Sequence, residues 1–130
     1  KLEFFQANRP IQKEILSLAS FSNFENSKLK ILDLKSVAKL KLVALIMRDK
    51  SRDLFDFGAI LAQDVLSADE IVNLFFKVDS KITSSNDIIN FIKSKKEPKD
   101  DEAVYLSETD RVNFTFNEIK EQVIEALSLL

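Results

Sequence analysis

Two cationic side chains, Lys41 and Arg48, lie seven residues apart in an otherwise apolar stretch. Seven residues make about two turns of an α-helix, so both side chains project from the same face. Two carboxylates, Asp53 and Asp56, follow them and share a face of the next helix for the same reason. A cation buried on an apolar helix needs an anionic partner. The partner is either this pair of carboxylates or a bound phosphate.

The charge of the chain is unevenly distributed. Residues 1–50 contain ten Lys or Arg and five Asp or Glu, whereas residues 51–130 contain nine and sixteen. The basic part suits an anionic ligand such as a triphosphate, although a solvated lysine face gives the same pattern. The acidic part argues against broad nucleic-acid binding by this chain alone.

The sequence contains neither cysteine nor histidine. Disulfides, thiolate metal sites and imidazole catalysis are therefore excluded. No apolar run reaches the roughly 18 residues needed to span a membrane. No secretory signal is visible, so we expect a cytoplasmic protein with no membrane partner.

Apolar periodicity and capping residues predict an α+β chain that is predominantly helical. Extended segments are predicted at residues 1–5, 28–32, 104–106 and 112–116. Helices are predicted at residues 10–19, 33–48, 51–63, 67–78, 84–96 and 115–129. The predicted capping residues are Asp33, Ser51, Ser67, either Ser84 or Ser85, and Thr115. A polar loop is expected at residues 20–28 and a charged linker at residues 97–102. From Val37 to Met47 the helix is apolar nearly all round, which predicts a central, buried element.

The stretch from residue 33 to residue 62 resembles the AbiEii/AbiGii toxin family of nucleotidyltransferases. That family carries a helix of the form Lys-Leu-x-Ala-Leu-x-x-Arg, then a short basic loop and Arg-Asp-hydrophobic-aromatic-Asp. The matching residues here are Lys41, Leu42, Ala44, Leu45, Arg48, Lys50, Arg52, Asp53, Phe55 and Asp56. The family's Gly-Ser motif, with its first two metal-binding carboxylates, has no counterpart in this sequence, whose only glycine is Gly58.

The resemblance implies a division of the chain into two parts. Residues 1–62 would be the C-terminal part of a nucleotidyltransferase-like domain, and residues 63–130 a helical bundle appendage. Because the chain begins with Lys1 and opens directly on a strand-like segment, we expect it to be a portion of a longer protein. The implied reaction moves a nucleoside monophosphate from an NTP to a hydroxyl of RNA, protein or a small acceptor. With two metal ligands missing, we expect this portion alone to be inactive.

The resemblance also implies roles for individual residues. Lys41 would hold the phosphates of the nucleotide, and Asp53 would orient the acceptor hydroxyl or help to deprotonate it. Arg48 and Arg52 would bind phosphate, although they could equally join the two helices through the aspartates. Asp56 would complete this substrate-binding set.

Glu3 is the candidate metal ligand. Related nucleotidyltransferases place a third carboxylate on a strand, where it helps to hold Mg²⁺ against the triphosphate. The segment Lys-Leu-Glu-Phe-Phe has the right form, with an acid on the exposed face of a strand. An alternating strand also places Glu outward without any function.

A binding module explains the same residues without catalysis. The basic and acidic side chains would then be a structural cluster of ion pairs, and the helices would bind an antitoxin or another protein partner. Geometry separates the two interpretations. Convergence of Lys41, Asp53 and Glu3 on an open cleft favours the enzyme, whereas saturation of both aspartates by arginines in a closed interface favours the module.

Overall fold

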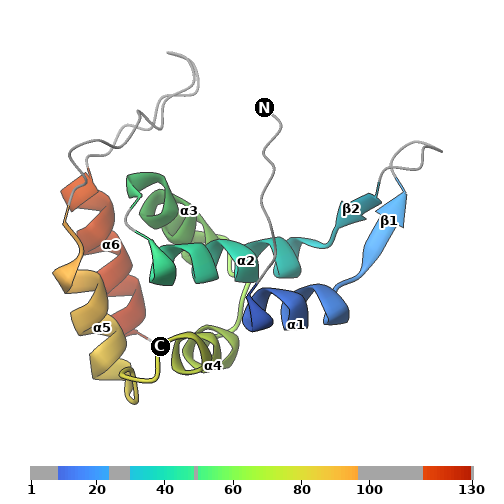
Figure 1. The fold of residues 1–130 in the computed structure, drawn as a ribbon. Coiled ribbons are helices and arrows are strands. Elements are labelled where there is room, and N and C mark those ends of the chain that lie inside the picture. Colours follow the sequence, from blue (N-terminus) through green and yellow to red (C-terminus); the bar gives the residue numbers. More distant parts are fainter. Residues whose placement is uncertain (1–8, 24–29, 49, 97–115, 130) are drawn as a thin grey trace, which may run out of the picture.

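The computed structural model describes residues 9–23, 30–48, 50–96 and 116–129 (Figure 1). In chain order these residues form α1 (Pro10–Leu18), β1 (Phe21–Asn23), β2 (Lys30–Leu32), α2 (Leu34–Met47), α3 (Ser51–Ala62), α4 (Ala68–Val78), α5 (Ser85–Ser94) and α6 (Phe116–Ser128). The prediction of a predominantly helical α+β chain is therefore confirmed for the described residues. None of these helices is long and apolar enough to cross a membrane.

The two short strands pair antiparallel, with Phe21 opposite Leu32 and Asn23 opposite Lys30. Strand β2 confirms the extended segment predicted at residues 28–32, whereas β1 lies where a loop was expected. All three β1 residues are exposed. A strand with no buried face does not need the alternation of apolar and polar residues by which strands are predicted. The extended segments expected at residues 1–5 and 104–106 lie outside the described residues. Of the segment expected at 112–116 only Phe116 is described, and it begins α6.

Helix α2 lies at the centre of the molecule, as its apolar sequence predicts. It packs against α1, α3 and α4 (Figure 1). Its residues Leu42, Val43 and Leu45 are at most 1% exposed. Because neighbouring helices surround α2, the side chains at its ends and sides have little freedom to move.

Polar side chains mark the starts of three helices as predicted. Asp33 accepts the backbone N–H of Ser36 at the start of α2, and Ser84, one of the two candidates, caps α5. Ser67 and Glu70 form a reciprocal capping box on α4. Helix α3 differs, because its N-cap is Lys50 and no side chain caps it. The prediction that Ser51 is the cap is therefore wrong by one position.

The C-terminal helices belong to the same hydrophobic core as the rest of the chain. Helix α6 packs against both α3 and α5, which lies beside it in Figure 1. The ring of Phe75 on α4 contacts Phe57 on α3 and, edge-on, Phe91 on α5, with centroids 6.2 and 5.8 Å apart. Aromatic contacts thus join three helices across the predicted boundary near residue 62. The functional division of the chain there stays a prediction.

Gly58, in the interior of α3, gives a test of the α3–α6 packing. A Cβ added there would lie 3.6 Å from Ile119 and 3.7 Å from Val123, at ordinary contact distance. Gly58→Ala should therefore stabilise the protein by about 0.5–1 kcal/mol, because alanine loses less backbone entropy in a helix. Gly58→Leu should destabilise it by about 1–3 kcal/mol through overpacking. Urea unfolding of both variants measures this, and a destabilised alanine variant would contradict the packing described.

Candidate functional site

The junction between α2 and α3 brings together four of the residues singled out in the sequence. Lys41 and Arg48 both extend from α2 toward α3, where they contact Asp56 and Asp53. The prediction that the two cations project in the same direction is confirmed. Each cation has its own carboxylate, so the junction contains two separate ion pairs.

Arg48 and Asp53 form a bidentate pair. The Arg48 Nε and Nη2 atoms donate to the two carboxylate oxygens of Asp53 at 2.7 and 2.9 Å. Arg48 is the C-cap of α2 and Asp53 lies in the first turn of α3, so the pair closes the three-residue connection between the two helices. A carboxylate at a helix N-terminus also interacts favourably with the helix dipole. Asp53 is therefore held by the helix that carries it and by the helix before it.

The buried member of the Arg48–Asp53 pair is the carboxylate, whereas the sequence predicted a buried cation. The Asp53 side chain is only 4% exposed, whereas that of Arg48 is 46% exposed. The buried charge of this junction is thus the carboxylate, and the expectation of buried cations is wrong. A long basic side chain on an apolar helix keeps its charged end at the surface, which is less costly than desolvating it.

Lys41 and Asp56 form the more open pair. The Lys41 Nζ atom lies 3.0 Å from Asp56 Oδ2, with side chains 46% and 39% exposed. An exposed pair of this kind contributes roughly 0.2–1 kcal/mol to stability. The two ion pairs therefore differ in the exposure of the carboxylate, which is 39% for Asp56 and 4% for Asp53.

Two of the predicted site residues, Arg52 and Glu3, take no part in the ion pairs described above. Arg52 lies partly buried in the first turn of α3, and Glu3 lies outside the described residues. No group of three carboxylates that could hold a metal ion occurs among the residues that the structure describes. Both oxygens of Asp53 already accept from Arg48. The described residues alone therefore do not fit a magnesium site.

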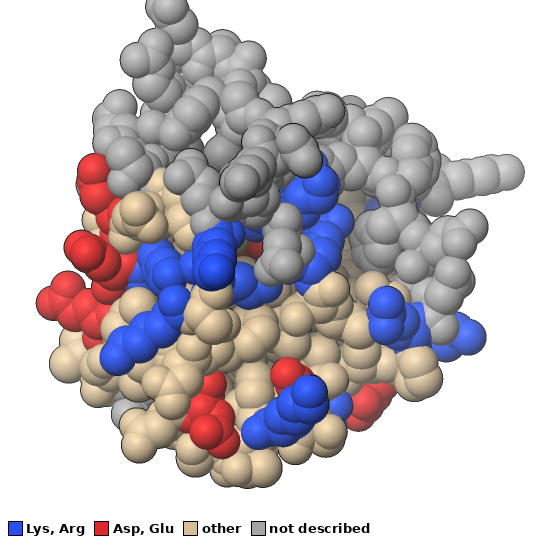
Figure 2. All heavy atoms as spheres, turned by 60° about the vertical axis from the view of Figure 1, so that its left-hand side comes forward, with Lys and Arg blue, Asp and Glu red and all other residues tan. Residues whose placement is uncertain are grey.

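Two further lysines adjoin this junction and were missed in the sequence. Lys95 Nζ donates to the backbone carbonyl of Arg48 at 2.9 Å, and Lys120 Nζ donates to the carbonyl of Lys95. Basic side chains gather on the side of the molecule where α5 and α6 come forward (Figure 2). In the sequence, Lys95 lies at the end of one predicted helix and Lys120 lies within another, and neither position has a local signal for a contact with α2.

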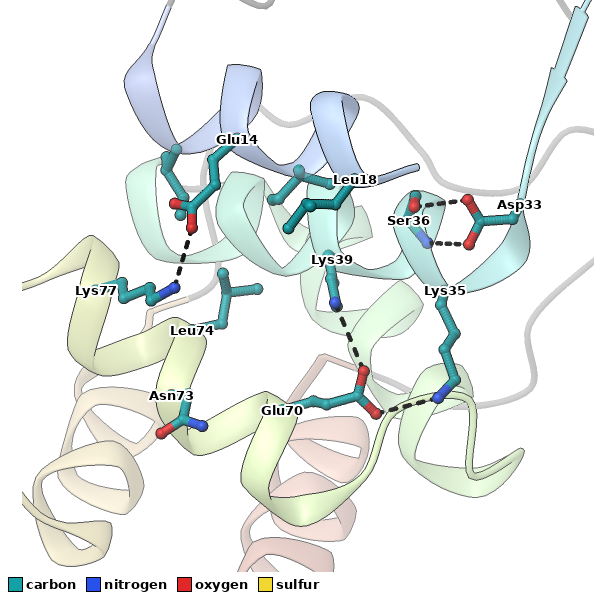
Figure 3. Close-up of a pocket in the computed structure, with 12 residues that line it drawn as sticks. Glu14, Leu18, Asp33, Lys35, Ser36, Lys39, Glu70, Asn73, Leu74 and Lys77 are labelled. Carbon is teal, nitrogen blue, oxygen red and sulfur yellow. Dashed lines mark hydrogen bonds and ion pairs between the residues drawn. The ribbon is translucent and has the colours of Figure 1, made fainter. Parts of the chain in front are cut away.

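A pocket of about 350 Å³ lies on the other side of α2, between α1 and α4 (Figure 3). Its apolar lining comes from Ile11, Ile15, Leu18 and Leu74, and its charged lining includes Lys35, Lys39, Lys77, Glu14 and Glu70. Lys35 and Lys39 both contact Glu70, and Lys77 contacts Glu14. Ion pairs within the protein thus account for the charged groups, and none of the predicted site residues lines the pocket.

Hydrogen bonds to two carboxylates beside this pocket lower their pKa values. The Ser67 backbone N–H is the main cause of the lowered pKa of Glu70. The Ser36 hydroxyl, 2.7 Å from Asp33 Oδ1, is the main cause of the lowered pKa of Asp33. Both carboxylates act as helix caps, so their ionised forms stabilise the starts of α4 and α2.

Comparison with known proteins now identifies the class. The family of nucleotidyl transferase AbiEii toxins, from type IV toxin–antitoxin systems, matches residues 1–125. The chain therefore belongs to this family, which confirms the resemblance noted over residues 33–62. No curated protein matches the chain, and no solved structure matches it.

The asymmetric burial of the Arg48–Asp53 pair predicts an asymmetric response to mutation. Arg48→Met should cost on the order of 3 kcal/mol or more, because it leaves a buried carboxylate without its cation. Asp53→Asn should cost about 1–2 kcal/mol, because the half-exposed guanidinium becomes hydrated. Chemical unfolding at neutral pH measures both free energies of unfolding. Equal losses would contradict the assignment of the buried charge to Asp53.

Glu70→Gln tests the cap of α4 through its pH dependence. A lowered pKa in the folded protein means that the ionised group stabilises the fold above the ordinary pKa of 4.5. That contribution is lost as pH falls through the lowered folded value. Glutamine keeps the acceptor for Ser67 but cannot titrate. We expect the variant to be less stable than wild type at pH 6 and nearly equal at pH 2.5. Urea unfolding at both pH values measures this, and a constant difference would refute it.

Proposed function

We propose that this protein takes part in nucleotidyl transfer from an NTP to a hydroxyl of RNA, protein or a small acceptor, with release of pyrophosphate. Membership of the AbiEii family supports the class of reaction. The observation that carries the proposal is the half-exposed Lys41 on α2, together with the Arg48–Asp53 pair, whose carboxylate is buried. A half-exposed cation and a carboxylate held by two hydrogen bonds suit a substrate that has a polyphosphate and a hydroxyl to be oriented.

Lys41 holds phosphate in this proposal. Its ammonium group has three donors, and Asp56 receives one hydrogen bond from it. The other donors face a half-exposed surface, where a polyphosphate has access. A lysine acts on phosphate as a compact point charge and does not need the fixed planar geometry of an arginine.

The two arginines and the two aspartates complete the proposed site. Each Asp53 oxygen has a second lone pair beyond its bond to Arg48, through which it would orient the acceptor hydroxyl or take its proton. The bidentate bonds fix the direction of that carboxylate. Arg52 would bind phosphate, and Asp56 would hold Lys41 in place until the nucleotide replaces it.

Mg²⁺ and Glu3 enter the proposal through the family resemblance alone. When bound, the metal would neutralise charge on the triphosphate. The described residues do not supply its ligands, so no step is assigned to it. The sequence has no Gly-Ser pair, and in this proposal the 130-residue chain transfers no nucleotide without that segment. An antitoxin protein is the proposed partner, and the cytoplasm the proposed compartment.

A binding module is the second candidate, and two observations favour it. Asp53 and Asp56 are both engaged by cations of α2. In addition, Leu18, Phe21, Ile31 and Leu34 are large apolar side chains that are 47–79% exposed around the β1–β2 hairpin. Phe21 pairs with Leu32 and Ile31 with Ser22, so the ribbon exposes an apolar side chain on each face. Exposed large apolar side chains suit a surface that binds another protein. An antitoxin is the partner that this candidate would take.

Lys41 and Lys39 provide a matched test of the proposed function. Both lie on α2 and contact a carboxylate, Asp56 for Lys41 and Glu70 for Lys39. In a longer form of the protein that carries the Gly-Ser segment, Lys41→Met should weaken Mg-NTP binding by about tenfold or more through loss of a charged contact. Lys39→Met should leave it unchanged. Calorimetric titration with the four NTPs measures the affinities.

Two outcomes of that titration would count against the enzyme. Unchanged affinity in a folded Lys41→Met variant removes the role of Lys41 in binding phosphate. Equal weakening by Lys39→Met shows a general effect of charge instead of a site. The binding module gains in both cases, because it requires no nucleotide contact from either lysine.

A further inference from the structure

A chain of contacts joins the C-terminal helices to the Arg48–Asp53 pair. Lys120 of α6 donates to the carbonyl of Lys95, at the end of α5. Lys95 in turn donates to the carbonyl of Arg48, 47 residues earlier, and Arg48 binds both oxygens of Asp53. Four helices thus meet through three successive contacts, although their residues are far apart in the sequence.

The Lys95 side chain is placed by the hydrophobic core. Its Nζ atom lies 4.9 Å from the centre of the Phe91 ring, within the range of a cation–π contact. Phe91 packs edge-on against Phe75, which is fully buried on α4. Lys95 is only partly exposed. Its ammonium group is therefore directed at the end of α2 by packing as well as by hydrogen bonding.

Lys95 binds the backbone carbonyl of Arg48 and thereby holds the backbone from which the Arg48 side chain extends. Arg48 is the C-cap of α2, and its backbone is extended with φ −147° and ψ 166°. The last carbonyls of a helix have no partner within the helix. A cation from another helix satisfies this one and interacts favourably with the negative end of the helix dipole. This contact therefore holds the end of α2 in addition to the Arg48–Asp53 pair.

We propose that Lys95, held by Lys120, is a positioning residue for the Arg48–Asp53 pair. It fixes the backbone of Arg48 so that the guanidinium meets both oxygens of Asp53. The residues beyond position 62 would then act on the candidate site instead of forming an independent appendage. The consequence for nucleotidyl transfer rests on the proposed function, whereas the positioning itself concerns only the folded chain.

NMR of the arginine side chain tests the positioning directly. The Arg48 Nε–H group donates to Asp53 at 2.7 Å, so its hydrogen exchange reports on the pair. In the 130-residue chain, Lys95→Met should accelerate this exchange by about tenfold or more in the folded state. Lys95→Arg should restore slow exchange, because it keeps a donor and a cation over Phe91. Lys93→Met, at an exposed position of the same helix, should have no effect.

The outcomes separate positioning from general stabilisation. A Lys95→Met variant with a lower melting temperature but wild-type exchange at Arg48 Nε–H would overturn the proposal. If that variant does not fold, the same exchange at Arg48 Nε–H is measured in Lys120→Met, which removes the contact that holds Lys95. Unchanged exchange in the Lys120→Met variant also overturns the proposal. The proposed function is tested separately, by titrating Mg-ATP into wild-type protein that carries the Gly-Ser segment. Absence of binding there would refute nucleotide binding and leave the exchange result to decide the positioning.

Discussion

The carboxylate of Asp53 is the constraint on which this structure depends. It is nearly inaccessible to solvent, and both of its oxygens accept from Arg48. A buried carboxylate is stable only when it is paired and hydrogen-bonded, so the position of α3 follows from that of Arg48 at the end of α2. The apolar face of α3 then packs against α2 and α6. One ion pair thus sets how two helices meet and which surface they leave open.

Helix α2 separates its basic residues into two environments. Lys41 and Arg48 face α3, whereas Lys35 and Lys39 face α4 and share Glu70. The first environment contains a deeply buried carboxylate and an exposed lysine. The second contains a pocket whose charged groups are satisfied within the protein. The difference in burial, more than the number of cations, makes the α2–α3 junction the stronger candidate for nucleotide chemistry.

Family membership and geometry contribute different parts of the functional argument. The match over residues 1–125 gives the class, a nucleotidyl transferase toxin of type IV toxin–antitoxin systems. The geometry shows that its aspartates are engaged, and that lysines from α5 and α6 reach the same junction. The last part of the chain is therefore physically connected to the motif that carries the resemblance. Nucleotide binding and antitoxin binding place different demands on this junction, since only the first requires Lys41 to exchange Asp56 for a phosphate.

The sequence by itself determined the helices, the central position of α2 and the direction shared by Lys41 and Arg48, because these follow from apolar periodicity and capping residues that act locally. It also identified Asp53 and Asp56 as their acidic neighbours. Only the tertiary structure decided which cation pairs with which aspartate and that Asp53 is the buried group. It also decided that Lys95 binds the end of α2. These contacts join residues between 5 and 47 positions apart. They form because whole helices pack together, and a local sequence pattern does not show how helices pack.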